Sequence, residues 1–227
     1  MKPLHSAIGN VHFAIESIRP RQKLTTTFAL IIAGMYELFF KSLTAKINLT
    51  EEEQHLFKGY LTPKKLRKRQ YLLQEGDVCK YSAFVEKGAL RAYTVDEKGS
   101  EYIVQFAVEG WTIADLYSYI TGEPATYNIE ALEDSELLLI SNAAQDELIK
   151  RIPQYEHYIR LQMQGAYIAL QRRLTAMVTM STEERYTNLV NTYPDIVQRV
   201  PQHMIASYLG LTPETLSRTR RQMTNRK

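Results

Sequence analysis

The 227-residue sequence holds a single cysteine, Cys79. One cysteine excludes an intramolecular disulfide framework and any metal or iron–sulfur site built only from cysteines of one chain. Such sparse use of cysteine fits a reducing compartment, and we expect the protein in the cytoplasm. The five histidines are scattered, without the spacing of a zinc protease or a zinc finger. The sequence therefore predicts no metal site.

Patterns typical of enzymes and of membrane proteins are also missing. No phosphate-binding glycine loop and no recognisable catalytic spacing is present, so we do not expect an enzyme. The longest apolar stretch, residues 28–40, is interrupted by Glu37 and is too short to cross a bilayer. Basic residues precede this stretch, but the lead-in is long and no clear small-residue cleavage site follows, which argues against a secretory signal.

Charge is distributed unevenly, although the net charge is only +3. Residues 199–227 carry six basic residues and one acidic residue, and residues 1–34 carry four basic residues and one acidic residue. The middle of the chain is therefore acidic. A basic end on an acidic body is typical of a nucleic-acid-binding module joined to another domain.

The basic C-terminal end predicts two short helices joined by a glycine turn. Gly210 lies where the first helix needs a left-handed residue to end it. Thr212 and Pro213 then suit the N-cap and the first position of a second helix. The outer face of this second helix carries residues spaced by i, i+3, i+4 and i+7: Glu214, Ser217, Arg218 and Arg221.

This outer face suits the major groove of DNA. A guanidinium can donate two hydrogen bonds to guanine, and a carboxylate can accept one from cytosine. We therefore predict that Arg218 and Glu214 read bases. The residues predicted to contact phosphates are Thr212, Ser217, Arg220 and Arg221. The alternative is a helical pair that serves protein contact rather than DNA binding.

The central part of the sequence predicts a small antiparallel β-barrel or jelly roll. From residue 64 to residue 140, glycines spaced by 11 or 12 residues separate short runs rich in β-branched and aromatic side chains. Residues 96–99 form the clearest hairpin loop. Before this region, Thr50 and Glu53 have the spacing of a capping box at the start of a short helix.

Residues 155–180 predict an unusually long helix, which follows a short helix over residues 143–152. Its apolar stripe advances by three and four residues, as in helices that pair with a copy of themselves. Packing on the β domain alone is the alternative, and we favour a dimer. The stripe consists of Ile159, Met163, Ala166, Leu170, Leu174 and Met177. Ser181 and Glu184 predict a second capping box that begins the next helix.

The predicted fold class is therefore α+β. Residues 1–34 form an extension, and Met35 is predicted as the natural start. Residues 35–153 form a jelly-roll-like antiparallel β domain, residues 154–180 the dimerisation helix, and residues 181–227 the helix-turn-helix domain.

One stretch of the β domain has the composition of a ligand pocket. Residues 110–127 hold the only tryptophan, three tyrosines and a Gly-Glu-Pro turn. Within it, residues 114–120 are predicted as a short helix whose N-terminal amides face an anion. Each aromatic residue taken singly fits a core under a loop. Taken together they fit a pocket, and both interpretations stay open.

In the order of its parts the chain resembles the Crp/Fnr transcription factors. Members of this family combine a cyclic-nucleotide-binding β-roll, a long dimerisation helix and a C-terminal winged helix-turn-helix. The resemblance covers residues 35–227 and is most specific over residues 205–218 and 110–127. Residues 110–118, together with residues 181–186, look like the branch common in Bacteroidetes. The resemblance implies a homodimer on palindromic DNA, with RNA polymerase and a small-molecule effector as candidate partners.

The sequence departs from the family pattern where a nucleotide would bind. Nucleotide-binding members carry a glutamate for the ribose and an arginine for the cyclic phosphate, where this chain has Asp115 and Ala125. Because the charge-assisted partner of the phosphate is missing, we do not expect cyclic AMP as the effector. The family's iron–sulfur cluster needs four cysteines and is not expected either, so the cofactor stays unassigned. The resemblance implies these effector-pocket residues: Trp111, Ala114, Asp115, Leu116, Ala125 and Thr126.

The second helix of the helix-turn-helix departs from the family as well. Members place an arginine directly before the base-reading glutamate, where this chain has Pro213. Glu214 and Arg218 match the remaining base-reading positions, so we expect a different target sequence. Only four residues follow Met223, and we expect the family's wing to be truncated or absent.

Overall fold

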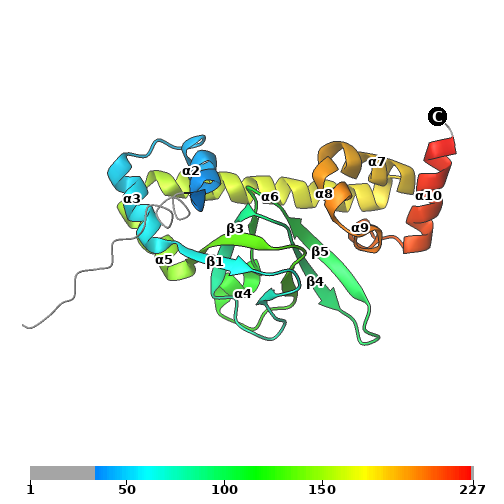
Figure 1. Cartoon of the computed structure of the whole chain (residues 1–227), viewed down its shortest axis with the longest axis horizontal. Helices are drawn as coiled ribbons and strands as arrows, with labels where there is room; N and C mark the ends of the chain where they lie inside the picture. The colour runs from blue at the N-terminus through cyan, green and yellow to red at the C-terminus, as the bar shows by residue number, and fades with distance from the viewer. Residues whose placement is uncertain (1–33, 226–227) are drawn as a thin grey trace, which may run out of the picture.

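The computed structural model describes residues 34–225. Residues 1–33 and 226–227 lie outside the described part, and so does nearly all of the predicted N-terminal extension. The described chain has a β domain in the middle and helices at both ends, joined by one long helix (Figure 1). The predicted α+β class is confirmed.

Two four-stranded antiparallel sheets form the β domain, with the orders β1-β8-β3-β6 and β2-β7-β4-β5. The strands are β1 (Thr62–Leu66), β2 (Tyr71–Leu73), β3 (Tyr81–Lys87), β4 (Leu90–Val95), β5 (Glu101–Ala107), β6 (Thr112–Ile113), β7 (Asn128–Ala131) and β8 (Ser135–Ser141). The predicted hairpin loop joins β4 to β5, closed by a hydrogen bond from the Asp96 N–H to the Ser100 carbonyl.

The inner faces of the two sheets share one apolar core. Val85, Leu90 and Leu137 are fully buried in it. The turn from β3 to β4 requires a glycine, because Gly88 has a φ of +104° and a Cβ there would lie 2.2 Å from the Ser135 Oγ. The regularly spaced turns thus close the roll that the sequence predicts.

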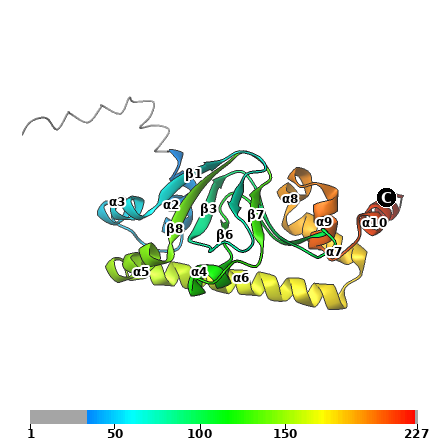
Figure 2. The same ribbon diagram turned by 90° about the horizontal axis from the view of Figure 1, so that it is seen from below.

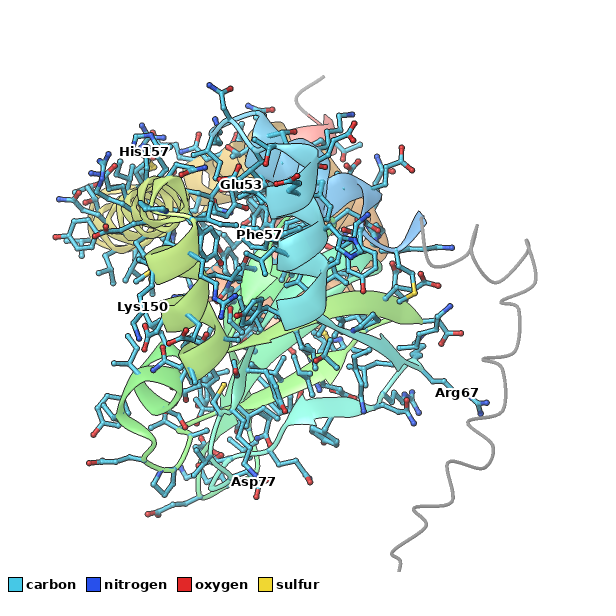
Figure 3. The ribbon with its side chains drawn as sticks, turned by 90° about the vertical axis from the view of Figure 1, so that its left-hand side faces the viewer. Glu53, Phe57, Arg67, Asp77, Lys150 and His157 are labelled. Carbon is cyan, nitrogen blue, oxygen red and sulfur yellow. The ribbon has the colours of Figure 1, made fainter. Side chains whose placement is uncertain are left out.

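Three helices cover one end of the roll: α2 (Glu37–Thr44), α3 (Glu51–Tyr60) and α5 (Asn142–Arg151). The predicted capping box at Thr50 begins α3. Phe57 of α3 is fully buried and meets the Tyr155 ring edge-on, with ring centres 4.7 Å apart. Figure 3 shows this end, with α3 beside the long helix and α5. Burying these aromatic rings anchors the start of the long helix.

The long helix α6 (Gln154–Thr179) matches the prediction to within one residue at each end. It runs along the long axis of the molecule and lies on one side of the β domain (Figures 1 and 2). Only Tyr155 and Tyr158 in its first turns are buried. Within residues 34–225, no helix is long and apolar enough to span a membrane.

Four helices form the C-terminal unit: α7 (Thr182–Thr192), α8 (Pro194–Arg199), α9 (Gln202–Tyr208) and α10 (Pro213–Asn225). The predicted capping box at Ser181 begins α7. α8 was not predicted, and Pro194 occupies its first turn. The unit packs on the β4–β5 hairpin, where Ile103 and Phe106 join the core around Ile205 and Leu216.

Candidate nucleic-acid interface

The turn before α10 has the predicted geometry. Gly210 adopts a φ of +69°, which ends α9. The Thr212 Oγ1 accepts a hydrogen bond from the Thr215 N–H at 3.2 Å, so Thr212 is the N-cap of α10. Leu216 and Thr219 are buried, which fixes the inward face of α10. The opposite face of the helix consequently points to solvent.

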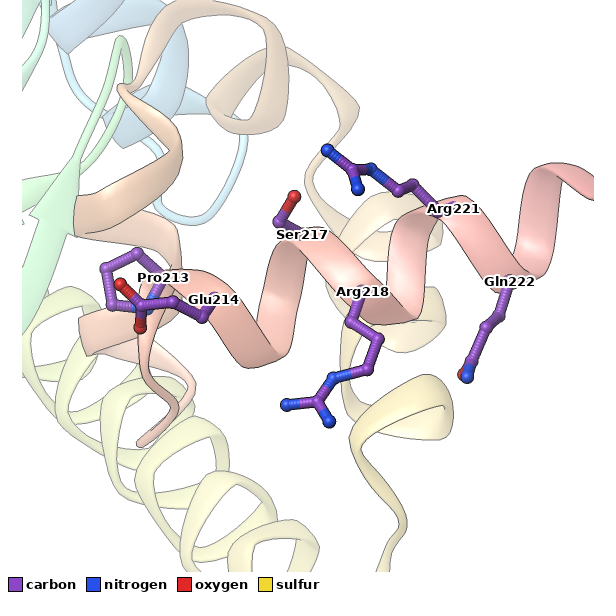
Figure 4. A pocket seen from close by; sticks show the side chains of 6 residues that line it. All are labelled: Pro213, Glu214, Ser217, Arg218, Arg221 and Gln222. Atoms are coloured by element: carbon purple, nitrogen blue, oxygen red, sulfur yellow. The ribbon is translucent and has the colours of Figure 1, made fainter.

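A shallow groove runs along this outward face (Figure 4). The groove is lined by Pro213, Glu214, Ser217, Arg218, Arg221 and Gln222. It therefore brings together four residues predicted to contact DNA. Gln222 was missed in the prediction, although it lies four residues after Arg218 and so on the same face. A glutamine amide can form a bidentate pair with adenine.

The charges of this face are not neutralised by other residues in the described part of the chain. The backbone N–H of Glu214 and the Thr212 hydroxyl hydrogen-bond to the Glu214 carboxylate and hold its pKa below the ordinary value. Glu214 is therefore an ionised acceptor at neutral pH. No ion pair engages Arg218 or Arg221 among residues 34–225, and both are exposed. Both guanidinium groups are therefore available to bind a ligand of opposite charge.

Arg220 lies on the flank of α10 rather than in the groove with Glu214. Its guanidinium stands 5.9 Å from the centre of the Tyr186 ring in α7. A second groove holds Arg220 and Arg221 together with Gln202 at the start of α9. This position suits a contact at the edge of a DNA groove, where the phosphates lie.

The predicted dimer stripe lies mostly at the surface of α6. Leu174 is 57% exposed, and Met163, Ala166, Leu170 and Met177 are exposed too. Ile159 instead packs partly against the aromatic cluster at the start of the helix. The structure adds three exposed apolar residues that the predicted stripe omitted: Tyr167, Ile168 and Val178. Bare apolar surface of this extent on one helix is typical of an interface.

Asp115 was predicted to contact an effector, and in the structure its carboxylate accepts hydrogen bonds from its own segment. It is 1% exposed and is the N-cap of α4 (Leu116–Thr121), so the helix predicted from residue 114 begins two residues later. Its Oδ1 accepts from the Ser118 N–H at 3.1 Å. Its Oδ2 accepts from the Thr126 N–H at 2.8 Å and from the Thr126 hydroxyl at 3.2 Å. Both carboxylate oxygens therefore tie the segment to itself.

The other predicted pocket residues differ in their exposure to solvent. Leu116 is exposed, whereas Ala125 is buried in the core of the roll. The ring of Trp111 meets Tyr193 at the end of α7, with ring centres 5.1 Å apart. The Tyr127 hydroxyl donates to the Ala114 carbonyl at 3.2 Å, and burial together with the nearby Asp115 raises the pKa of Tyr127 to about 12.

Residues 63–152 match the family described as the cyclic nucleotide-binding domain. Over 188 residues the chain is 28% identical to the regulatory protein HlyX of Actinobacillus pleuropneumoniae, covering 78% of each chain. It is also 28% identical over 166 residues to the fumarate and nitrate reduction regulatory protein of Vibrio cholerae, covering 68% of this chain and 66% of that relative.

Among solved structures, the fold is similar to that of FixK2 from Bradyrhizobium japonicum. The TM-score is 0.63, with 19% sequence identity, and the match covers 73% of this chain and 85% of that one. At this identity the likeness concerns the fold. It supports a β-roll followed by a long helix and C-terminal helices, as seen along Figure 1.

Proposed function

We propose that this chain is a regulator of the Crp/Fnr type that binds palindromic DNA as a homodimer through α10. In this proposal Arg218 and Glu214 contact base edges in the major groove. Thr212, Ser217, Arg220 and Arg221 contact phosphates. The protein then acts where the chromosome lies, in agreement with the expected cytoplasmic location.

The uncompensated charge on α10 is the observation that carries this proposal. The groove presents two guanidinium groups that form no ion pair within residues 34–225. They lie beside one ionised carboxylate on the same helical face. Arginine suits guanine, and a carboxylate suits cytosine. A helix that served protein contact would instead be expected to present apolar side chains at the centre of its face.

The exposed stripe of α6 supports the homodimer. A second copy of α6 would bury the apolar side chains around Leu170 and Leu174 in a parallel pair. Two recognition helices related by a two-fold axis then require half-sites about 10 base pairs apart. RNA polymerase remains a candidate partner of this dimer on DNA.

The segment around Asp115 does not fit a cyclic nucleotide. Both Asp115 oxygens already accept hydrogen bonds from the segment itself. Ala125 offers no charge to a phosphate and is buried. The proposed regulator therefore responds to an effector of other chemistry or works without one.

A salt titration tests the proposed DNA contact. Fluorescence anisotropy with a short labelled duplex should show affinity that falls steeply as salt rises, because each phosphate contact releases a counterion. A logarithmic slope of about −4 or steeper is expected for four or more contacts per dimer. Weak binding with no dependence on salt would contradict the proposal and favour a protein-contact role.

A further inference from the structure

The C-terminal unit is joined to the edge of the β4–β5 hairpin by Ser207 of α9. The Ser207 Oγ accepts from the Ile103 N–H at 2.9 Å and donates to the Glu101 carbonyl at 3.1 Å. Among residues 34–225, β5 is the edge strand of its sheet, so its outward backbone groups have no neighbouring strand there to bind. One hydroxyl of α9 thus replaces part of a missing strand.

Arg173 of α6 reaches the same strand edge. Its guanidinium donates to the Val104 carbonyl at 2.5 Å and to the Ile103 carbonyl at 3.2 Å. It also lies 4.0 Å from the centre of the Tyr208 ring in α9. The long helix, the hairpin and α9 therefore meet around one side chain.

Arg173 carries an energetic cost of desolvation where α6, α9 and the β4–β5 hairpin meet, a contact that we call the joint. Burial lowers its pKa below the ordinary value, and no carboxylate among residues 34–225 forms an ion pair with it. Its Nε has no hydrogen-bond partner in the described part of the chain. An apolar side chain of similar length would avoid this desolvation. Compared with such an apolar residue, Arg173 adds no stability. It adds hydrogen bonds of defined geometry between α6 and the edge of β5.

The turn before α10 is held by neighbouring elements as well. The Arg185 Nη1 donates to the Leu209 carbonyl at 2.8 Å. A Cβ at Gly210 would lie 3.0 Å from the Met177 Cε of α6, so α6 passes close to this turn. The turn before α10 therefore lies against both α7 and α6.

The packing of the C-terminal unit on the hairpin and α6 leaves the outward face of α10 exposed to solvent. We call this face, which is proposed to contact DNA, the reading face. Glu214, Ser217, Arg218 and Arg221 are all exposed while the joint is closed. An inhibitory contact would be expected to cover that face, so the joint orients α10 instead of blocking it.

We propose that Arg173 and Ser207 are positioning residues that fix the angle between α10 and α6, and so set the half-site spacing that the dimer accepts. The inference rests on the proposed DNA-binding dimer. One additional base pair rotates a half-site by about 35° and moves it by about 3.4 Å. While Arg173 and Ser207 hold the joint together, α10 cannot move to meet the displaced half-site. When their hydrogen bonds are removed, it can.

Binding to a set of related duplexes tests the inference, with duplexes that carry the selected palindrome, the same half-sites one base pair closer or farther apart, or one half-site alone. The parent should prefer the best spacing by about tenfold, comparable to the effect of one mismatched base pair. Arg173→Met and Ser207→Ala should reduce this preference to about threefold or less, with affinity for the single half-site unchanged. Arg173→Lys, which can still donate to the carbonyls, should restore part of it.

Arg172→Met is the matched control, because Arg172 is an exposed neighbour on α6 and its replacement removes the same charge. It should keep the spacing preference of the parent. The inference is overturned if Arg173→Met and Ser207→Ala keep that preference too. It is equally overturned if they weaken all duplexes alike and lower the unfolding temperature, since that is a structural effect. A parent that binds no duplex would overturn the proposed function itself.

Discussion

Asp115 and Glu214 both stand at the start of a helix, yet their surroundings differ completely. Asp115 is the buried N-cap of α4, and its oxygens accept hydrogen bonds from Ser118 and Thr126. Glu214 lies in the first turn of α10 and faces solvent beside Arg218. The same chemistry stabilises the fold at the first position and is available to a ligand at the second.

This difference separates the β domain from the C-terminal unit. The segment around α4 has the composition of a sensor, but its polar groups already bind one another. The groove of α10 has charged groups that form no ion pair with any other described residue. The proposed function therefore rests on the charge at this face of α10 and not on the concentration of aromatic residues around α4.

The largest expected effect concerns stability and comes from Asp115→Ala. The change removes the acceptor of three hydrogen bonds and leaves buried N–H groups unpaired, so the free energy of unfolding should fall by about 3 kcal/mol or more. Urea unfolding followed by circular dichroism measures this. Glu123→Ala, at an exposed position of the same segment, should cost far less. Equal stability of the two variants would show that Asp115 does not hold the segment together.

Arg218→Ala should have the next largest effect, on binding alone. Loss of a bidentate contact to guanine should cost about 1–3 kcal/mol of binding free energy and relax specificity at one base pair. Because Arg218 is exposed, unfolding should change by only about 0.5 kcal/mol. Arg218→Lys keeps the charge and loses the bidentate geometry, so it should retain non-specific binding. If Arg218→Ala kept the sequence preference of the parent, Arg218 would not be a base-contacting residue.

The smallest expected effect is a pH dependence of the contact between α8 and the roll. Arg199 pairs with Glu109 at 2.7 Å and with Glu133. Burial alone would raise the pKa of Glu109. The hydrogen bond and charge of Arg199, together with hydrogen bonds from the Gly88 and Glu109 backbone N–H groups, hold that pKa below the ordinary value. A depressed folded-state pKa means that this stabilisation is present above the ordinary value and is lost as pH falls through the folded pKa.

Hydrogen exchange of α8 measured from neutral pH to below pH ~4 tests this point. Protection of α8, after correction for intrinsic exchange, should fall at the acidic end in the parent. Arg199→Met should show weaker protection already at neutral pH and a flatter pH profile. Identical profiles would exclude the ion pair as the cause.

Much of the fold follows from local signals in the sequence. The caps at Thr50, Ser181 and Thr212 begin helices where predicted, because the N-cap hydrogen bond joins residues only three apart. Gly210 ends α9 for an equally local reason. The bounds of α6 follow from its uninterrupted helical pattern.

Contacts between distant segments could not be predicted in this way. Ser207 binds the edge of β5 more than a hundred residues away, and nothing in the periodicity near Ser207 indicates it. The hydrogen bonds that Asp115 accepts depend on a loop that places Thr126 next to it. The outward face of α10 was predictable because a single helix determines it, apart from Gln222. Whether its residues bind DNA as assigned stays a prediction.

Selection of bound duplexes from random sequence tests directly whether α10 reads DNA in a homodimer. The purified full-length protein should enrich a palindrome whose half-sites lie about 10 base pairs apart, with two chains per duplex. Arg218→Ala should enrich the same palindrome with one position relaxed. Enrichment of no sequence, or of a site without two-fold symmetry, would contradict the account of α10 as the DNA-reading helix of a homodimer.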